Sequence, residues 1–399
     1  RWRPSALDQR KLAAPLQAQK SKAEVCPWCR NDPALMKAAG IVSHGPLSIG
    51  PKGSDELVAK LLETEPEQRP NRAVEIAKTA HLRWASSLGP CNVELDDKKR
   101  VMAELARLKQ VLPTVPDEPK KLDPFLRLHL FAMKGEEFFA RFQKLLAVTD
   151  ADFPESRQAT GPYMGNGRFL GEKDKFEAVI HSTRANHKLF VVDFAGAAPT
   201  DSLRWHLKDQ HKMIASIPAE DPDLKKDKSL FPHVVHNLSH LCFDAYKHFS
   251  YDPPLWLTEG LALCMEKEIE PTSTTNEGEE GGKSDVRGPK DWNAAVKKLV
   301  AAGKQKRLAQ LLPMKEVAEL DEDAKLTAWS MVRFLLDAHP EATAKFLGGV
   351  KGQLDEQGLP TGRDLPELQR KLLKECWGWT PVTFDEAWLA WVSAAPASK

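Results

Sequence analysis

The sequence lacks the features that mark membrane and nucleic-acid-binding proteins. No apolar run approaches the ~18 residues needed to cross a bilayer, so we expect a soluble chain without a membrane span. Lys and Arg number 57 against 56 for Asp and Glu. Basic clusters with interleaved aromatic residues are missing, so we expect no nucleic-acid partner. The first residue is Arg1 and not Met, so the absence of a leader peptide is uninformative about the compartment.

Cysteine is scarce, with six residues in a chain of 399, which is too few for a disulfide-dependent scaffold. Two of the six, Cys26 and Cys29, lie in the segment CPWC. A haem attachment would need His directly after Cys29, where Arg30 stands, and a redox dithiol is expected at a strand-to-helix turn. Two interpretations therefore stay open, a second metal site and a local disulfide. A metal would need two further ligands; the candidates, whose spacing matches no zinc pattern, are His44, His81 and Cys91.

The distribution of proline and apolar residues divides the chain into two parts. Residues 1–77 are polar and rich in proline, and we interpret them as an N-terminal extension with one short helix at 54–62. In residues 78–395 the apolar periodicity predicts strands at 79–85, 125–131, 176–181 and 189–194. It predicts helices at 96–112, 135–146, 201–216, 230–249, 255–269, 291–302, 324–337 and 384–394. Strands followed by helices indicate the α+β class, and residues 270–289 read as a mobile loop.

The strongest functional signal lies in residues 233–268, HVVHNLSHLCFDAYKHFSYDPPLWLTEGLALCMEKE. His236 and His240 are four residues apart, so their side chains project from one face of a helix. Eighteen residues separate His240 from Glu259, enough to end the first helix at Pro253-Pro254 and to start a second one beside it. Glu259 can then supply a third ligand. Two imidazoles and one carboxylate with a fourth position open form the arrangement of a catalytic zinc site.

This combination resembles the gluzincin metallopeptidases. Their pattern is His-Glu-x-x-His followed, in the aminopeptidase branch, eighteen residues later by the glutamate of a Trp-Leu-x-Glu-Gly-x-Ala helix. It is also similar to the peptidase-MA-like domains of bacterial extracellular proteins. The resemblance covers about residues 78–395 and implies a gluzincin-like mixed sheet followed by a helical subdomain. It further implies zinc on His236, His240 and Glu259, and a periplasmic or extracellular location.

The chain departs from the family pattern at the catalytic positions. Asn237 stands where the family has its general base, a glutamate that takes a proton from the attacking water and passes it to the leaving amine. A carboxamide cannot do this work. The downstream Tyr or His that stabilises the oxyanion is also missing, because all three tyrosines precede Glu259 and His339 is the sole histidine after it. The resemblance therefore implies a pseudo-metallopeptidase that binds zinc and serves as a binding or scaffold module, with a peptide or protein in the old cleft.

Two other functions stay open. The chain could be an active zinc metallopeptidase or hydrolase whose base comes from elsewhere, and the nearest acids are Asp244, Glu266 and Glu268. It could also be a metal-free structural subunit of a larger assembly. His233 shares the face of His236, but it lies ~10 Å from His240 along the helix axis. We therefore interpret His233 as an orienting or solvent-facing neighbour and not as a ligand.

Overall fold

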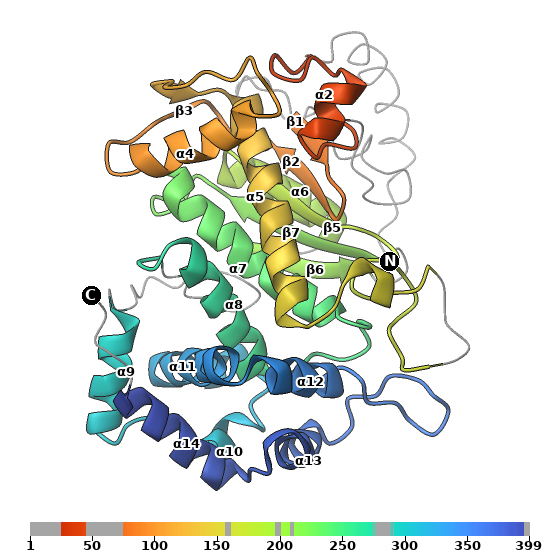
Figure 1. Cartoon of the computed structure of the whole chain (residues 1–399), viewed down its shortest axis with the longest axis vertical. Coiled ribbons are helices and arrows are strands. Elements are labelled where there is room, and N and C mark those ends of the chain that lie inside the picture. The colour runs from red at the N-terminus through yellow and green to blue at the C-terminus, as the bar shows by residue number, and fades with distance from the viewer. Residues whose placement is uncertain are drawn as a thin grey trace. The chain divides into compact units, whose positions relative to one another are not determined.

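The computed structural model describes residues 25–44, 75–155, 161–195, 201–207, 211–273, 275, 289 and 291–394. The chain divides into two units, one of residues 1–139 with 175–234 and one of residues 140–174 with 235–399. The first unit contains a five-stranded sheet, and the second is built from helices (Figure 1). A mixed sheet and the helices that follow it agree with the predicted α+β class.

The sheet of the first unit has the strand order β1-β2-β5-β7-β6. Its members are β1 (Glu75–Lys78), β2 (Leu82–Ser86), β5 (Phe176–His181), β7 (Lys212–Pro218) and β6 (Leu203–Leu207). Strands β2, β5 and β7 are parallel, whereas β1 and β6 pair antiparallel at the two edges. Every residue of β5 and β7 is buried, as expected for central strands covered on both faces. A second, two-stranded sheet joins β3 (Cys91–Asn92) to β4 (Lys121–Leu122).

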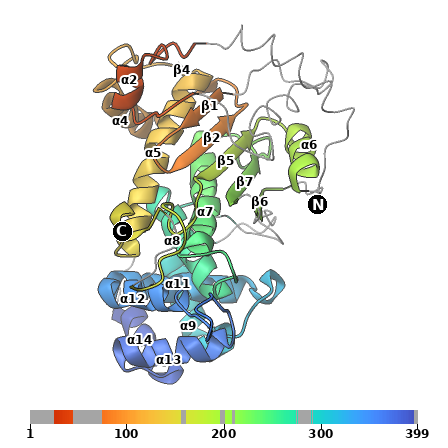
Figure 2. The same ribbon diagram turned by 90° about the vertical axis from the view of Figure 1, so that its right-hand side faces the viewer.

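Helices α5 (Pro124–Leu145) and α6 (Arg184–Ala195) lie on opposite faces of this sheet, as the two views in Figures 1 and 2 show. Helix α6 packs on β5 and β7. Helix α5 approaches β2 at Gly135, where a Cβ atom would clash with the side chains of Trp84 and Leu82. Glycine at this position therefore allows the close contact between helix and strand.

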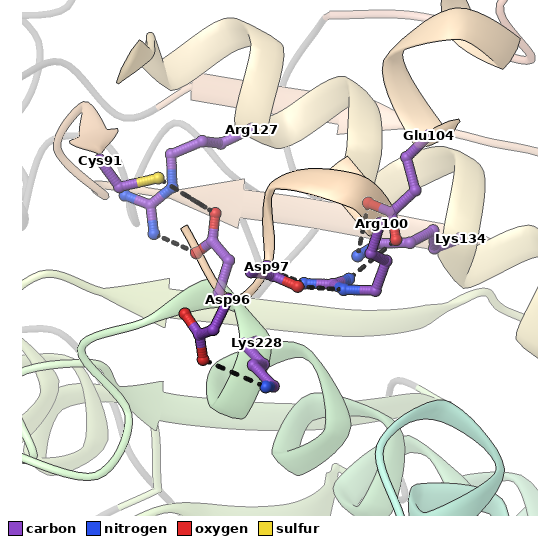
Figure 3. A network of polar contacts seen from close by, with 9 residues as sticks. Cys91, Asp96, Asp97, Arg100, Glu104, Arg127, Lys134 and Lys228 are labelled. Carbon is purple, nitrogen blue, oxygen red and sulfur yellow. Dashed lines mark hydrogen bonds and ion pairs between the residues drawn. The ribbon is translucent and has the colours of Figure 1, made fainter. Parts of the chain in front are cut away.

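Charged side chains connect α5 to α4 (Lys98–Lys109) and to the start of α7 (Asp227–Ala245) (Figure 3). Arg127 of α5 binds Asp227 through two nitrogens, one of them Nε at 3.0 Å from Oδ2. Lys134 Nζ lies 3.3 Å from Glu104 Oε2 on α4. Because Arg127 and Lys134 are buried, these pairs supply the counter-charges that such cations need away from water.

The second unit consists of helices. They are α8 (Leu255–Ile269), α9 (Trp292–Ala301), α10 (Leu308–Leu311), α11 (Glu322–Ala338), α12 (Pro340–Val350), α13 (Leu365–Trp377) and α14 (Pro381–Ala394). Helix α8 packs closely on α11. At Gly260 of α8 a Cβ atom would lie 2.5 Å from Val332 Cγ2 and 2.9 Å from the carbonyl oxygen of Ala328. Helix α8 therefore packs on α11 more closely than any larger residue would allow.

Three predicted elements are wrong. Residues 125–131 belong to the long helix α5 and not to a strand. Residues 189–194 belong to α6. The helix predicted at 201–216 is instead the antiparallel pair β6 and β7, with His211 at φ 54° in the connection between them. The helix predicted at 135–146 is the second half of α5, and the other predicted elements within the described residues agree in type with β2, α4, β5, α7, α8, α9, α11 and α14.

Two further expectations concern residues at the margins of the described chain. The helix predicted at 54–62 lies outside the described residues, and so does most of the loop predicted at 270–289. Residues 25–44 and strand β1, which fall in the predicted N-terminal extension, belong to the same unit as the sheet. Across the described ranges, every helix is too short or too polar to cross a bilayer.

Candidate functional site

The two histidines of the motif lie one turn apart on α7, as their spacing predicts. Their Nε2 atoms are 3.3 Å apart and their ring centroids 5.0 Å apart. His236 is fully buried, and His240 is 4% exposed. Both rings therefore present a nitrogen to the same point in the protein interior.

Glu259 of α8 completes a triangle with these nitrogens. Its Oε2 atom lies 3.3 Å from Nε2 of His240 and 3.8 Å from Nε2 of His236. Two ligand atoms held at about 2.0–2.1 Å from a tetrahedral zinc stand roughly 3.3 Å apart. The three residues predicted as ligands thus come together at separations that fit one zinc ion.

The second oxygen of Glu259 supports the same fit. Glu259 is 3% exposed, and its Oε1 atom has no hydrogen-bond partner among the described residues. A buried carboxylate oxygen without a donor costs free energy, on the order of 1–3 kcal/mol. A cation bound beside Glu259 would compensate the buried negative charge.

Glu266, which the sequence offered only as an acid that could replace the missing base, is instead the hydrogen-bond partner of His236. Its Oε2 atom lies 3.0 Å from Nδ1 of His236, and its Oε1 atom accepts hydrogen bonds from Ser273 (2.5 Å) and Thr275 (2.9 Å). Burial by itself raises the pKa of Glu266, but the hydrogen bond from His236, together with the charge of Lys267 and the hydrogen bond from Ser273, brings the pKa below its ordinary value. A metal-binding histidine commonly donates its other N–H to such a carboxylate. A signal was present in the sequence, since Glu266 follows Glu259 by seven residues, or two helical turns.

The position of the general base is occupied by a fully buried amide. Asn237 lies on α7 next to His236 and has no exposed surface. The group of potential ligand atoms here consists of His236, His240 and Glu259, with no fourth His, Cys, Asp or Glu of the described chain within 4.8 Å of all three. None of the other acids considered from the sequence supplies a free carboxylate in this group.

Each of those other acids has a different environment. Glu266 holds His236 from the side opposite to Nε2. Glu268 is 43% exposed and forms an ion pair with Arg141, at 2.6 Å between Oε1 and an arginine nitrogen. Asp244 lies near the end of α7, where its backbone carbonyl accepts a hydrogen bond from Lys351.

The other two histidines considered for this site are occupied elsewhere. Nε2 of His233 lies 2.7 Å from Oγ of Ser202, and the ring is 1% exposed, so the expectation of a solvent-facing side chain is wrong. His233 is not part of the ligand group. His339, the sole histidine after Glu259, packs against the rings of Trp379 and Phe334 at centroid distances of 5.1 and 5.3 Å.

Hydrogen bonds from the C-terminal end of α12 stabilise the segment that connects α7 to α8. The buried Lys351 donates from Nζ to the carbonyl oxygens of Asp244 (2.9 Å) and Tyr251 (3.3 Å). In return, Nε2 of His248 donates to the carbonyl of Lys351 at 3.0 Å. Lys247 adds a hydrogen bond from Nζ to the carbonyl of Gly348 at 2.6 Å. These reciprocal bonds, which we name the α12 clamp, fix the turn that places Glu259 beside the two histidines.

The cysteine pair near the start of the chain lies in the first unit, and the structure brings it together with two histidines. Cys26 and Cys29 are buried and free, and their sulfurs lie close to ring nitrogens of His129 and His44. His44 was one of the possible partners considered from the sequence, whereas His129 was not. His81 instead pairs with Glu136.

No protein-family model, curated protein or solved structure matches this chain.

Proposed function

We propose that the chain carries a gluzincin-like zinc site that has lost peptidase chemistry and serves as a binding or scaffold module for a peptide or protein. The observation that carries this proposal is the triangle of His236, His240 and Glu259 with an amide, Asn237, at the position of the base. The separations of the ligand atoms and the uncompensated oxygen of Glu259 support zinc as the ion.

The residues of the site have two roles in binding an ion: three supply ligand atoms and one orients a ligand. His236 and His240 would bind it through Nε2 and Glu259 through Oε2, while Glu266 keeps the N–H of His236 on Nδ1. A zinc ion in such a site polarises carbonyl groups and lowers the pKa of water. The carboxamide of Asn237 accepts no proton at neutral pH, and losing a positioned base typically costs ~10²–10⁴ in rate.

The burial of the ligands supports a structural use of the ion. All three side chains are at most 5% exposed. In this setting the ion joins the second half of α7 to α8 and maintains the shape of the surface above them. We infer that a partner is recognised by this maintained surface and not by being cleaved.

The test compares the wild-type chain with Asn237→Glu, which restores the base, and Asn237→Gln, which changes size without adding a carboxylate. Hydrolysis of fluorescent casein and zinc content are measured together. We expect one zinc at this site in all three proteins, absent after His240→Ala, and wild-type hydrolysis at the level of Asn237→Gln. Because a base is worth ~10²–10⁴ in rate, any hydrolysis should appear first in Asn237→Glu.

Two outcomes would overturn the proposal in favour of the alternatives. If wild-type hydrolysis equals that of Asn237→Glu and is abolished by His240→Ala, the chain is an active hydrolase with a different base. If His240→Ala leaves the zinc content unchanged, the site binds no metal and the chain is a structural subunit.

A further inference from the structure

Four side chains of the first unit converge at a second place, which shares no residue with the site of His236, His240 and Glu259. The Sγ atom of Cys26 lies 3.2 Å from Nε2 of His129, and the Sγ atom of Cys29 lies 3.2 Å from Nε2 of His44. All four ligand atoms lie within 4.8 Å of one another. We propose that Cys26, Cys29, His44 and His129 bind a structural zinc ion, and we name this group the Cys2His2 cluster.

The donor set and its dimensions suit a closed zinc site. Zinc prefers four ligands of the sulfur and nitrogen type in a tetrahedron when its role is structural. With bonds of about 2.3 Å to sulfur and 2.0–2.1 Å to nitrogen, neighbouring ligand atoms stand roughly 3.3–3.8 Å apart. The two sulfur-to-nitrogen distances of 3.2 Å are slightly below this range, so small side-chain rotations suffice to seat the ion.

The backbone around the two cysteines has the form of a metal-binding turn. The N–H of Arg30 donates to the carbonyl of Cys26 at 2.8 Å, and the N–H of Asp32 donates to the carbonyl of Cys29 at 2.8 Å, so a tight turn follows each cysteine. Arg30 and Asn31 both have φ of 52°, a left-handed conformation that asparagine tolerates but that is unfavourable for arginine. Such a conformation persists where its surroundings hold it in place.

Burial distinguishes this group from a redox dithiol. Cys26 and Cys29 are fully buried, and His129 is 2% exposed. Burial lowers the pKa of His129 to about 4, so its ring is neutral and has a lone pair available for an ion. A catalytic dithiol needs a partly exposed thiol of low pKa, whereas burial raises the pKa of Cys26 to about 12 when no cation is bound. The two sulfurs are also not joined to each other, and each faces a histidine.

The ion would attach residues 25–44 to the helices beneath them. Within this segment, α2 (Pro33–Ala38) has no fully buried residue, so apolar packing alone holds it weakly. Trp28 donates from Nε1 to Asp123 at 3.0 Å, next to the start of α5, the helix that carries His129. The cysteines pack in one apolar cluster with Leu105 of α4 and Leu126 of α5. The Cys2His2 cluster thus joins residues 25–44 to α5, and its two cysteines are members of this apolar cluster.

Cobalt(II) substitution of the full chain separates this site from the other one. Only cobalt bound to thiolate gives a sulfur-to-cobalt charge-transfer band, which two histidines and a glutamate cannot produce. The chelator-treated wild type reconstituted with cobalt should show this band, and so should His240→Ala and the matched control Cys376→Ser. The double variant Cys26→Ser/Cys29→Ser should lose the band and one zinc per chain, while retaining the zinc that His240→Ala removes.

A second variant keeps the test decisive if the double variant does not fold. His44→Cys preserves four ligands and adds a third sulfur, so its charge-transfer band should be stronger than that of the wild type. The proposal is overturned if the wild type shows no such band. It is equally overturned if alkylation and mass mapping of the protein, purified without reductant, find Cys26 and Cys29 joined in a disulfide.

Discussion

Glu266 Oε2 lies 3.0 Å from Nδ1 of His236, and neither side chain has any exposed surface. Because the carboxylate can only accept, the proton of the neutral ring resides on Nδ1. The lone pair of Nε2 is therefore directed toward His240 and Glu259. This single contact sets both the tautomer and the orientation of the first histidine of the motif.

Replacing Glu266 should weaken metal binding without removing a ligand. We expect Glu266→Ala to lower zinc affinity by roughly 10- to 100-fold, the usual effect of losing the partner of a ligating histidine. Glu266→Gln retains an acceptor for Nδ1 and should lie between the wild type and the alanine variant. Zinc competition against a chromophoric chelator measures both. Glu268→Gln, an exposed change on the same helix, is the control, and an equal loss there would contradict the role of Glu266.

Replacing Glu259 should have opposite effects on the metal-free and metal-loaded proteins. Without an ion, Glu259 Oε1 is a buried oxygen that lacks a partner among the described residues, so Glu259→Gln should leave the thermal midpoint of the chelator-treated protein unchanged or raise it. The same variant should lose the part of the zinc-induced rise in midpoint that this site contributes, while any rise from zinc at the Cys2His2 cluster remains. Differential scanning calorimetry with and without zinc shows both effects. A zinc-induced rise in the variant equal to that of the wild type would remove Glu259 from the ligand set.

A methyl group at position 260 should disturb the packing beneath the site. In Gly260→Ala the Cβ atom meets Val332 and the backbone carbonyl of Ala328, and a backbone atom cannot rotate away. We expect a loss of about 1–3 kcal/mol in the free energy of unfolding, measured in urea. Gly348→Ala in α12 is the matched control, since its nearest neighbour would be Tyr246 Oη at 3.4 Å. That change should be neutral or stabilising by up to about 1 kcal/mol, because alanine is the better helix former.

The α12 clamp should make the second unit sensitive to acid. Nε2 of His248 donates to Lys351 while Nδ1 accepts the N–H of Ser250 at 3.1 Å, so both nitrogens are used by a neutral ring. Burial, followed by the charge of Lys351, lowers the pKa of His248 to about 3. Below pH 6.5 the unfolded chain takes up a proton at this residue and the folded chain does not, so stability falls as the pH falls toward 3.

The size of this effect follows from the pKa difference. Between pH 7 and pH 5 the wild type should lose about 2 kcal/mol of unfolding free energy through His248 alone. His248→Gln, which can donate and accept but does not titrate in this range, should reduce the measured pH dependence by that amount. Other buried histidines, such as His187, contribute equally to both proteins and cancel in the comparison. Urea unfolding at pH 7 and pH 5 measures this difference. An equal loss of unfolding free energy in His248→Gln and in the wild type would contradict the role of His248.

The elements around the motif could be predicted because local chemistry marks their ends. Helix α8 has the bounds predicted for it, since Pro253-Pro254 stops the chain before Leu255 and the apolar pattern continues to Ile269. The helical spacing of His236 and His240 likewise predicted which atoms would meet. Such signals depend only on residues a few positions apart.

The errors arose where polar residues are buried as deeply as apolar ones. In residues 125–131 three leucines alternate with Arg127 and His129, a pattern that predicts a strand with one solvent-exposed face. Both polar side chains are buried, because Arg127 pairs with Asp227 and His129 faces Cys26. Strand β7 is buried on both faces and shows no alternation at all. The partners that make such burial possible lie about 100 residues away in the sequence, where no local pattern reveals them.

The α12 clamp has a consequence for how the motif can be used. The hydrogen bonds that set the turn between α7 and α8 come from Lys351 and from the carbonyls of Gly348 and Lys351, all outside residues 233–268. A peptide containing only the motif would carry every ligand yet lack the support that aligns them. We therefore expect metal binding at this site to require the folded helical unit, so grafting the site onto another scaffold would require transferring the C-terminal end of α12 as well.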